Sequence, residues 1–241
     1  MRRFGLIGYP LSHSFSQKYF TEKFDREGIS NCRYDNFPIA DISELKNIIR
    51  NNPGLEGLNV TIPYKLQVIP LLDETHHLPI QACNCIKISS GNLSGYNTDV
   101  TGFEQSLLTK LKPNHRPALI LGKGGASEAV RFVLDKLQIK FIQVTRHPGP
   151  GELSYQDLTD KIIRQYLLII NCTPLGMYPK VGEAPPIPYE AIGPDHYLFD
   201  LIYNPEKTIF LQKGLGKGAL VQNGLDMLVI QAEESWKIWN S

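Results

Sequence analysis

A glycine-rich turn lies between a short apolar run and an amphipathic stretch in the second half of the chain. The apolar run is 118–121, the turn reads Gly-Lys-Gly-Gly-Ala at 122–126, and helical spacing follows. Glycines in such a turn let the backbone approach a diphosphate, whose charge is favoured at a helix N-terminus. Ser127 stands where the dinucleotide fingerprint has a third glycine or an alanine. Strand, turn and helix in this order predict a dinucleotide-binding site.

The next predicted strand, 141–145, indicates which dinucleotide to expect. NAD-binding chains carry an Asp or Glu about 20 residues after the turn, which binds the ribose 2′-hydroxyl. No acidic residue lies between Gln138 and Pro150, and Thr145-Arg146-His147 ends the strand instead. An arginine can pair with a 2′-phosphate and stack on adenine. We therefore expect NADP rather than NAD.

Polar side chains suited to acid–base chemistry and to binding hydroxyl groups gather in the first half of the chain. They are Ser12, Ser14 and Ser16 after the first predicted strand, Asn59, Thr61 and Lys65 around the end of the third, Asn84 in an otherwise apolar run, and Asn97, Thr98 and Asp99 before a predicted helix. Residues 61–65 fit the start of a helix, with Lys65 one turn in. Taken singly, Lys65 is a surface lysine and Asp99 an N-cap. Together at strand ends, where open α/β sheets bind ligands, they suit a polyhydroxylated ligand.

The elements that would position these residues alternate between strand and helix. In the first half we predict strands at 4–8, 33–37, 57–60, 83–88 and 93–96 and helices at 13–28, 41–51 and 99–111. In the second half we predict strands at 118–121, 141–145, 167–171 and 197–201 and helices at 126–137 and 225–239. The alternation predicts two α/β domains with mostly parallel sheets. The segment 112–117 is the best candidate linker, and the proline-rich 178–194 is a loop.

Composition narrows the class of protein. The 241 residues carry 25 Lys plus Arg and 24 Asp plus Glu, a net charge of +1, which argues against nucleic-acid or membrane-surface partners. No apolar run is long enough to span a bilayer, and no signal-peptide core follows the N-terminus. The four cysteines form no Cys-x-x-Cys pair, and the histidines, His76-His77 included, show no metal-ligand spacing. We expect a reduced, cytoplasmic protein without a bound metal.

Seven motifs follow one another along the chain. They are Ser-x-Ser at 14–16, Asn-Val-Thr-Ile-Pro-x-Lys at 59–65, Asn-Thr-Asp-x-x-Gly at 97–102, Gly-x-Gly-Gly-Ala at 122–126, Asn-x-Thr-Pro-x-Gly-Met at 171–177, Asp-x-Ile-Tyr-Asn-Pro at 200–205 and Asn-Gly-x-x-Met-Leu-x-x-Gln-Ala at 223–232. In type and order these motifs resemble those of the shikimate dehydrogenase family, and the resemblance runs over nearly the whole chain. It implies an oxidoreductase acting on a CH–OH group: reversible, NADPH-dependent reduction of 3-dehydroshikimate to shikimate in chorismate and aromatic amino acid biosynthesis.

The resemblance also implies roles for individual residues. Lys65 and Asp99 would be the catalytic pair. The substrate contacts would be Ser14, Ser16, Asn59, Thr61, Asn84, Tyr203 and Gln231. The cofactor would lie along Gly122, Gly124, Gly125, Ala126, Thr145, Arg146, Thr173, Met177 and Gly224. The expected substrate-binding domain is 1–98 plus 225–241, with the last helix packing back on it, and 99–224 is the expected Rossmann-type NADP-binding domain.

Departures from the family pattern leave alternatives open. The usual Asn-Arg-Thr is Thr145-Arg146-His147 here, and Lys123 fills a turn position that is usually small, where it adds a cation near the phosphates or faces solvent. One alternative is a quinate/shikimate dehydrogenase that uses NAD or a broader range of substrates. A more distant one is a non-catalytic regulator that binds the metabolite. The expected partner is the small-molecule substrate, and the chain is expected to be a monomer or a homodimer.

Overall fold

A computed structural model describes residues 1–11 and 15–241, so the predicted substrate residue Ser14 lies outside the described residues. The chain divides into two compact units, Met1–Thr98 with Gln231–Ser241 and Asp99–Ile230. The chain returns to the first unit at Gln231, whereas the sequence placed the return at residue 225. None of the described helices is long and apolar enough to cross a membrane.

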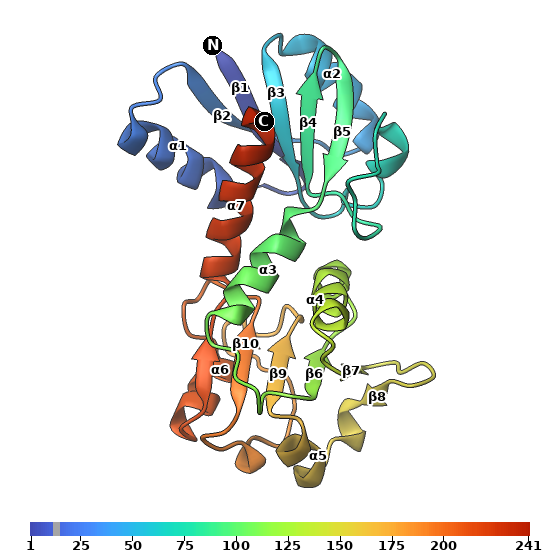
Figure 1. The fold of residues 1–241 in the computed structure, drawn as a ribbon, viewed down its shortest axis with the longest axis vertical. Helices are drawn as coiled ribbons and strands as arrows, with labels where there is room; N and C mark the ends of the chain where they lie inside the picture. Colours follow the sequence, from blue (N-terminus) through green and yellow to red (C-terminus); the bar gives the residue numbers. More distant parts are fainter. Residues whose placement is uncertain (12–14) are drawn as a thin grey trace. The chain divides into compact units, whose positions relative to one another are not determined.

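The first unit is built on a five-stranded sheet with the order β2-β1-β3-β4-β5 (Figure 1). Its elements are β1 (Arg2–Gly8), α1 (Phe15–Glu27), β2 (Cys32–Pro38), α2 (Leu45–Asn51), β3 (Leu55–Val60), β4 (Cys85–Ser89) and β5 (Asn92–Tyr96). β1 pairs in parallel with β2 and β3, while β4 is antiparallel to both β3 and β5. The beginning of β4 and the end of β5 therefore share the edge at which β1 and β3 end.

Alternating side chains of β1 divide the apolar core of this unit between the two faces of the sheet. Phe4 and Leu6 pack in one cluster with residues of α1 and of α7 (Leu225–Asn240), including Trp239, which stacks on Phe4 with ring centroids 4.8 Å apart. Ile7 packs in the other cluster with Leu45 of α2. The last helix therefore returns to the first unit, as predicted, where Trp239 is buried and Trp236 is half-buried.

The second unit has a six-stranded parallel sheet with the order β11-β10-β9-β6-β7-β8. Its elements are α3 (Thr98–Leu108), β6 (Ala118–Leu121), α4 (Gly125–Lys136), β7 (Phe141–Thr145), β8 (Leu153–Ser154), α5 (Asp160–Gln165), β9 (Leu168–Asn171), β10 (Tyr197–Asp200), α6 (Ile209–Gly216) and β11 (Leu220–Gln222). Counted from β6, this is the 3-2-1-4-5-6 order of a dinucleotide-binding Rossmann fold, confirming the predicted fold class.

Two predictions about local structure are wrong. The proline-rich segment 112–117 is not a linker between the units, because it lies inside the second one. His115 is buried there, accepts a hydrogen bond from Lys112 N and packs against Tyr197. Lys65 lies in a series of turns over residues 62–68, not in an α-helix. The sequence pattern does not distinguish these turns from the start of a helix, because the turns keep backbone hydrogen bonds of a similar kind. Tyr64 N–H donates to Thr61 O, and Val68 N–H donates to Tyr64 O.

Candidate functional site

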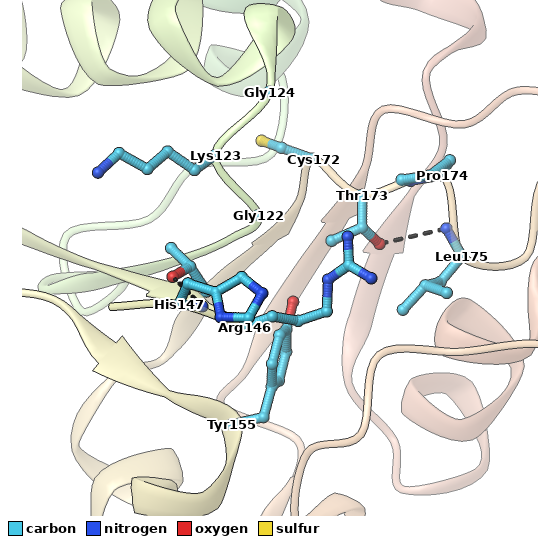
Figure 2. Close-up of a pocket in the computed structure, with 11 residues that line it drawn as sticks. Gly122, Lys123, Gly124, Arg146, His147, Tyr155, Cys172, Thr173, Pro174 and Leu175 are labelled. Carbon is cyan, nitrogen blue, oxygen red and sulfur yellow. Dashed lines mark hydrogen bonds between the residues drawn. The ribbon is translucent and has the colours of Figure 1, made fainter. Parts of the chain in front are cut away.

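A cavity of about 520 Å³ opens in the second unit at the point where the strand order reverses, beside the neighbouring strands β6 and β9. Ligands of open α/β sheets bind at this point, beyond the carboxyl ends of the strands. The lining residues lie at or just after the ends of β6, β7, β8 and β9: Gly122, Lys123, Gly124, Thr145, Arg146, His147, Tyr155, Cys172, Thr173, Pro174 and Leu175 (Figure 2). Five of the predicted cofactor residues thus share one pocket.

The glycine turn has the backbone that a diphosphate site requires. Gly122 has φ +100°, and a Cβ there would lie 2.8 Å from Thr173 Cγ2, so a larger residue would be strained. A Cβ on Gly124 or Gly125 would instead face open space, with no atom within 4 Å. α4 begins at Gly125 without a side-chain cap on its first turn. Uncapped N–H groups beside open space fit a bound diphosphate.

Ser127 forms hydrogen bonds that hold this turn in place, which accounts for the departure from the usual glycine or alanine. Its side chain is fully buried, and its hydroxyl donates to Gly124 O at 2.6 Å. Gln143 of β7 donates to Gly122 O at 2.8 Å and reaches the Ser127 hydroxyl at 3.3 Å. The serine therefore ties α4 to the neighbouring strand through hydrogen bonds.

Charged side chains flank the cavity at the end of β7. Arg146 is exposed on the pocket wall, next to His147, whose backbone N–H donates to Thr145 Oγ1 at 3.2 Å. Lys123 forms an ion pair with Glu152, with Nζ and Oε1 2.5 Å apart, and Glu152 also accepts from Gly149 N. The hydrogen bond from Lys123 lowers the pKa of Glu152. Lys123 is therefore tied to an acidic partner, while the Arg146 guanidinium points into the pocket (Figure 2).

A chain of buried hydrogen bonds holds the opposite wall of the cavity. Thr173 donates from both its backbone N–H and its hydroxyl to Asn171 Oδ1, at 3.0 and 2.7 Å. The Asn171 amide donates to Asp200 Oδ1 at 3.0 Å, and Thr208 donates to Asp200 Oδ2 at 2.6 Å. Asn171 and Asp200 are fully buried. The sequence motifs contain both Asn171 and Asp200, but the sequence did not predict that this series of hydrogen bonds positions Thr173.

Asp200 should make the stability of the protein depend on pH. Burial raises its pKa to about 6, against the hydrogen bonds from Thr208, Ile202 N and Asn171. The folded state therefore binds this proton more tightly than the unfolded state, and stability falls as pH rises from about 4 to about 6. The shift corresponds to about 3 kcal/mol. Asp200→Asn resembles the protonated acid, so it should remove this loss.

Urea unfolding at a series of pH values, followed by circular dichroism, measures this effect. Wild type should lose about 3 kcal/mol more unfolding free energy than Asp200→Asn between about pH 4 and about pH 7. Asp135→Asn, which changes an exposed aspartate on α4, is the matched control and should follow wild type. Parallel pH profiles for wild type and Asp200→Asn would contradict the prediction.

In the first unit, three of the predicted substrate residues form one buried network. Asn84 Nδ2 donates to Gln231 Oε1 at 3.4 Å and to Thr98 Oγ1 at 3.0 Å. Asn59 Nδ2 contacts Asn84 O at 3.3 Å and donates to Ser235 Oγ at 2.9 Å. All five side chains are less than a tenth exposed. The fold thus brings together residues of β3 and α7, Asn84 immediately before β4, and Thr98, the first residue of α3. Ser235 joins them without having been predicted.

Ser16 approaches the same network through a tyrosine. The Tyr34 hydroxyl donates to Asn59 Oδ1 at 2.8 Å. Burial raises the pKa of Tyr34 well above its usual range, and a hydrogen bond with Ser16 partly offsets this. A protonated Tyr34 is therefore fixed between Ser16 and Asn59, which orients the Asn59 amide group.

The other predicted residues fall on both units. Thr61 and Lys65 follow β3 in the first unit. Asp99, the second residue of α3, and Tyr203, after β10, belong to the second. In the second unit, the remaining cofactor candidates lie outside the pocket lining. Gly125 and Ala126 begin α4, Met177 is 48% exposed beyond Leu175, and a Cβ at Gly224 would collide with Leu201 O.

One cluster in the described part of the chain has the residue types of a metal site. Glu74, His76 and His77 place ligand atoms within 4.8 Å of one another. Both histidines are exposed, His77 stacks on Tyr96, and Glu74 accepts a hydrogen bond from Ser94 at 2.7 Å. No fourth described His, Cys, Asp or Glu joins the group. It lacks the four-ligand set of a closed structural zinc site.

Comparison with known proteins connects this architecture to a family. A model of the shikimate dehydrogenase substrate binding domain matches residues 6–86. The chain is 35% identical to the NADP(+) shikimate dehydrogenase of Methanococcus vannielii over 98% of this chain and 90% of that protein. It is 37% identical to the enzyme of the same name from Methanococcus maripaludis strain C7, again over 98% and 90%.

A solved structure agrees in fold over the same range. The crystal structure of a Thermus thermophilus shikimate 5-dehydrogenase in complex with NADP(H) and shikimate matches with a TM-score of 0.86. The identity is 28%, over 99% of this chain and 93% of that one. Sequence identity at this level extends along nearly the full length of both chains. It agrees with the Rossmann sheet, the glycine turn and the arginine at the end of β7. The chain belongs to the shikimate dehydrogenase family.

Proposed function

We propose that this chain catalyses the reversible, NADP-dependent oxidation of shikimate to 3-dehydroshikimate. The observation that carries the proposal is the pocket at the reversal of the strand order, where Arg146 rather than an acidic residue follows β7. Relatives of the same family, similar over 98% of the chain, are named as NADP(+) enzymes. The units would divide the work, with Met1–Thr98 and Gln231–Ser241 binding substrate and Asp99–Ile230 binding the cofactor.

The pocket residues fit an NADP molecule held by backbone and side chains. Gly122, Gly124 and the N-terminus of α4 would hold the diphosphate, and Arg146 would pair with the 2′-phosphate. Thr173, fixed by Asn171, would contact the cofactor from the β9 side. When bound, NADPH supplies the hydride for reduction of the substrate carbonyl.

Lys65, with Asp99 as its partner, would transfer the proton that the substrate oxygen gains or loses. As the carbonyl is reduced, its oxygen gains a proton, and Lys65 is suited to deliver it as a general acid. The lysine cation also stabilises negative charge that develops on that oxygen. In the reverse direction Lys65 would accept the hydroxyl proton, with Asp99 as its partner. Asn59, Asn84 and Gln231 would bind the ring hydroxyl groups with their amides.

The test is the appearance of reduced nicotinamide absorbance in four mixtures: shikimate or quinate, each with NADP or NAD. Rapid turnover of shikimate with NADP alone is the expected result. Comparable turnover of quinate, or of either substrate with NAD, would favour the broader dehydrogenase instead. Folded protein that binds shikimate but turns over no mixture would favour the regulatory role and contradict the proposal.

A further inference from the structure

Tyr155 stands beside Arg146 at the pocket wall because of strand register. β8 pairs in parallel with β7, with Thr145 opposite Ser154. Arg146 and Tyr155 are the next residues along each strand, so both leave the sheet at the same edge. The ring of Tyr155 packs against the apolar cluster of the second unit, and its hydroxyl points toward the Arg146 side chain in the pocket wall (Figure 2).

The hydroxyl of Tyr155 is buried and has no hydrogen-bond partner among the described residues. A buried polar group without a partner costs free energy, so such groups are uncommon and call for an explanation. Two other tyrosines of this unit have partners: half-buried Tyr189 donates to Pro185 O at 2.8 Å, and buried Tyr197 donates to Gln222 Oε1 at 2.5 Å. Of these three hydroxyls, only that of Tyr155 has an unused donor, and Tyr155 is a residue that lines the cavity.

The electrostatic surroundings keep this donor available. Burial, with a smaller contribution from the Cys172 side chain, raises the pKa of Tyr155 to about 12, and the charge of Arg146 opposes both. The hydroxyl therefore stays protonated at neutral pH. The electrostatic interaction with Arg146 also shows that the hydroxyl lies close to the guanidinium that we assign as the partner of the 2′-phosphate.

We infer that the Tyr155 hydroxyl is a specificity-determining group that donates a hydrogen bond to the 2′-phosphate of NADP beside Arg146. The inference rests on the proposed function and extends it to a residue outside the family motifs quoted above. A bond from a hydroxyl to a phosphate oxygen is charge-assisted and about twice as strong as a bond between neutral groups. The phosphate of NADP would therefore gain more from Tyr155 than the ribose hydroxyl of NAD.

Direct binding of two cofactor fragments, measured by calorimetry, tests the assignment without turnover. The fragments are 2′,5′-ADP, which carries the 2′-phosphate, and 5′-ADP, which lacks it. Tyr155→Phe should bind 2′,5′-ADP about tenfold more weakly than wild type and 5′-ADP equally well. Tyr189→Phe, which removes a hydroxyl bonded to Pro185 O away from the pocket, should bind both fragments as wild type does.

Thermal melting of the same proteins without ligand gives a second readout. Because the Tyr155 hydroxyl has no partner, Tyr155→Phe should melt at or above the wild-type temperature, whereas Tyr189→Phe should melt below it. A structural role for the Tyr155 hydroxyl would lower melting and leave fragment preference unchanged, which would overturn the inference.

Other outcomes separate this inference from the proposed function. Equal weakening of both fragments in Tyr155→Phe would place the hydroxyl on the adenine, the ribose or the 5′-phosphates and overturn the assignment to the 2′-phosphate. Unaltered preference in that variant, with wild type still favouring 2′,5′-ADP, would overturn the inference and leave the proposed function standing. Wild type without any preference would overturn both.

Discussion

Replacing Lys65 with alanine should lower the turnover of shikimate by about two to four orders of magnitude, the usual contribution of a positioned general acid or base. Lys65 lies in the turns that follow β3, at the carboxyl edge of the first sheet, where ligands of α/β sheets bind. The alanine variant can neither deliver a proton to the substrate oxygen nor stabilise charge on it. Because these interactions belong to the transition state, kcat should fall much more than KM rises.

Steady-state kinetics with shikimate and NADP measure this effect. Lys46→Ala removes an exposed lysine from α2 in the same unit and should keep wild-type kinetics. Asp99→Asn is the second variant, since a partner of Lys65 should also be needed for full turnover. Intact kcat in Lys65→Ala would exclude the acid–base role, and full activity of Asp99→Asn across the pH range would remove Asp99 from the mechanism.

The parts of the site that could be predicted from the sequence are those whose pattern lies within a short stretch of the chain. The strands 118–121 and 141–145 are bounded as predicted, and the turn between β6 and α4 could be read from its glycines. Each lies within one βαβ segment, where hydrophobic periodicity and turn composition suffice. The sheet order around them could not be predicted in the same way, because register between distant strands depends on packing.

Residues whose roles depend on distant contacts were not predicted from pattern alone. Asn84 and Gln231 are 147 positions apart in sequence, and only the family resemblance brought both into one site before the fold did. Asp200 reads as an ordinary strand end until β9 and β10 pair and place it against Asn171. Ser235 completes the first-unit network in the same manner, through its contacts with Asn59 and Thr98.

Tyr155 was missed for a different reason. The strand before it, β8, has only two residues and no hydrophobic period from which to recognise it. Its register with β7 alone places Tyr155 beside Arg146. The prediction for the segment around His115 was wrong in the opposite sense. Prolines and polar neighbours suggested an exposed linker, yet the His115 imidazole is buried against Tyr197. Composition indicates exposure only where no long-range contact overrides it.

Replacing Arg146 with aspartate should reverse the cofactor preference, lowering the ratio of kcat/KM for NADP to that for NAD by about two orders of magnitude. The loss of a charge-assisted bond to the 2′-phosphate accounts for about 1.5–3 kcal/mol. A carboxylate in its place would repel that phosphate and could accept a hydrogen bond from the 2′-hydroxyl of NAD. Lys123 should not compensate, because it is paired with Glu152.

The matched control is Arg164→Asp, which makes the same charge reversal at an exposed position on α5 in the same unit. Steady-state kinetics with both cofactors should leave its NADP-to-NAD ratio at the wild-type value. An unchanged ratio in Arg146→Asp would refute the assignment of Arg146 to the 2′-phosphate. Since both variants change the net charge equally, a shift confined to Arg146 would arise from its position at the end of β7, where it faces the cofactor pocket, and not from long-range attraction of a more anionic cofactor.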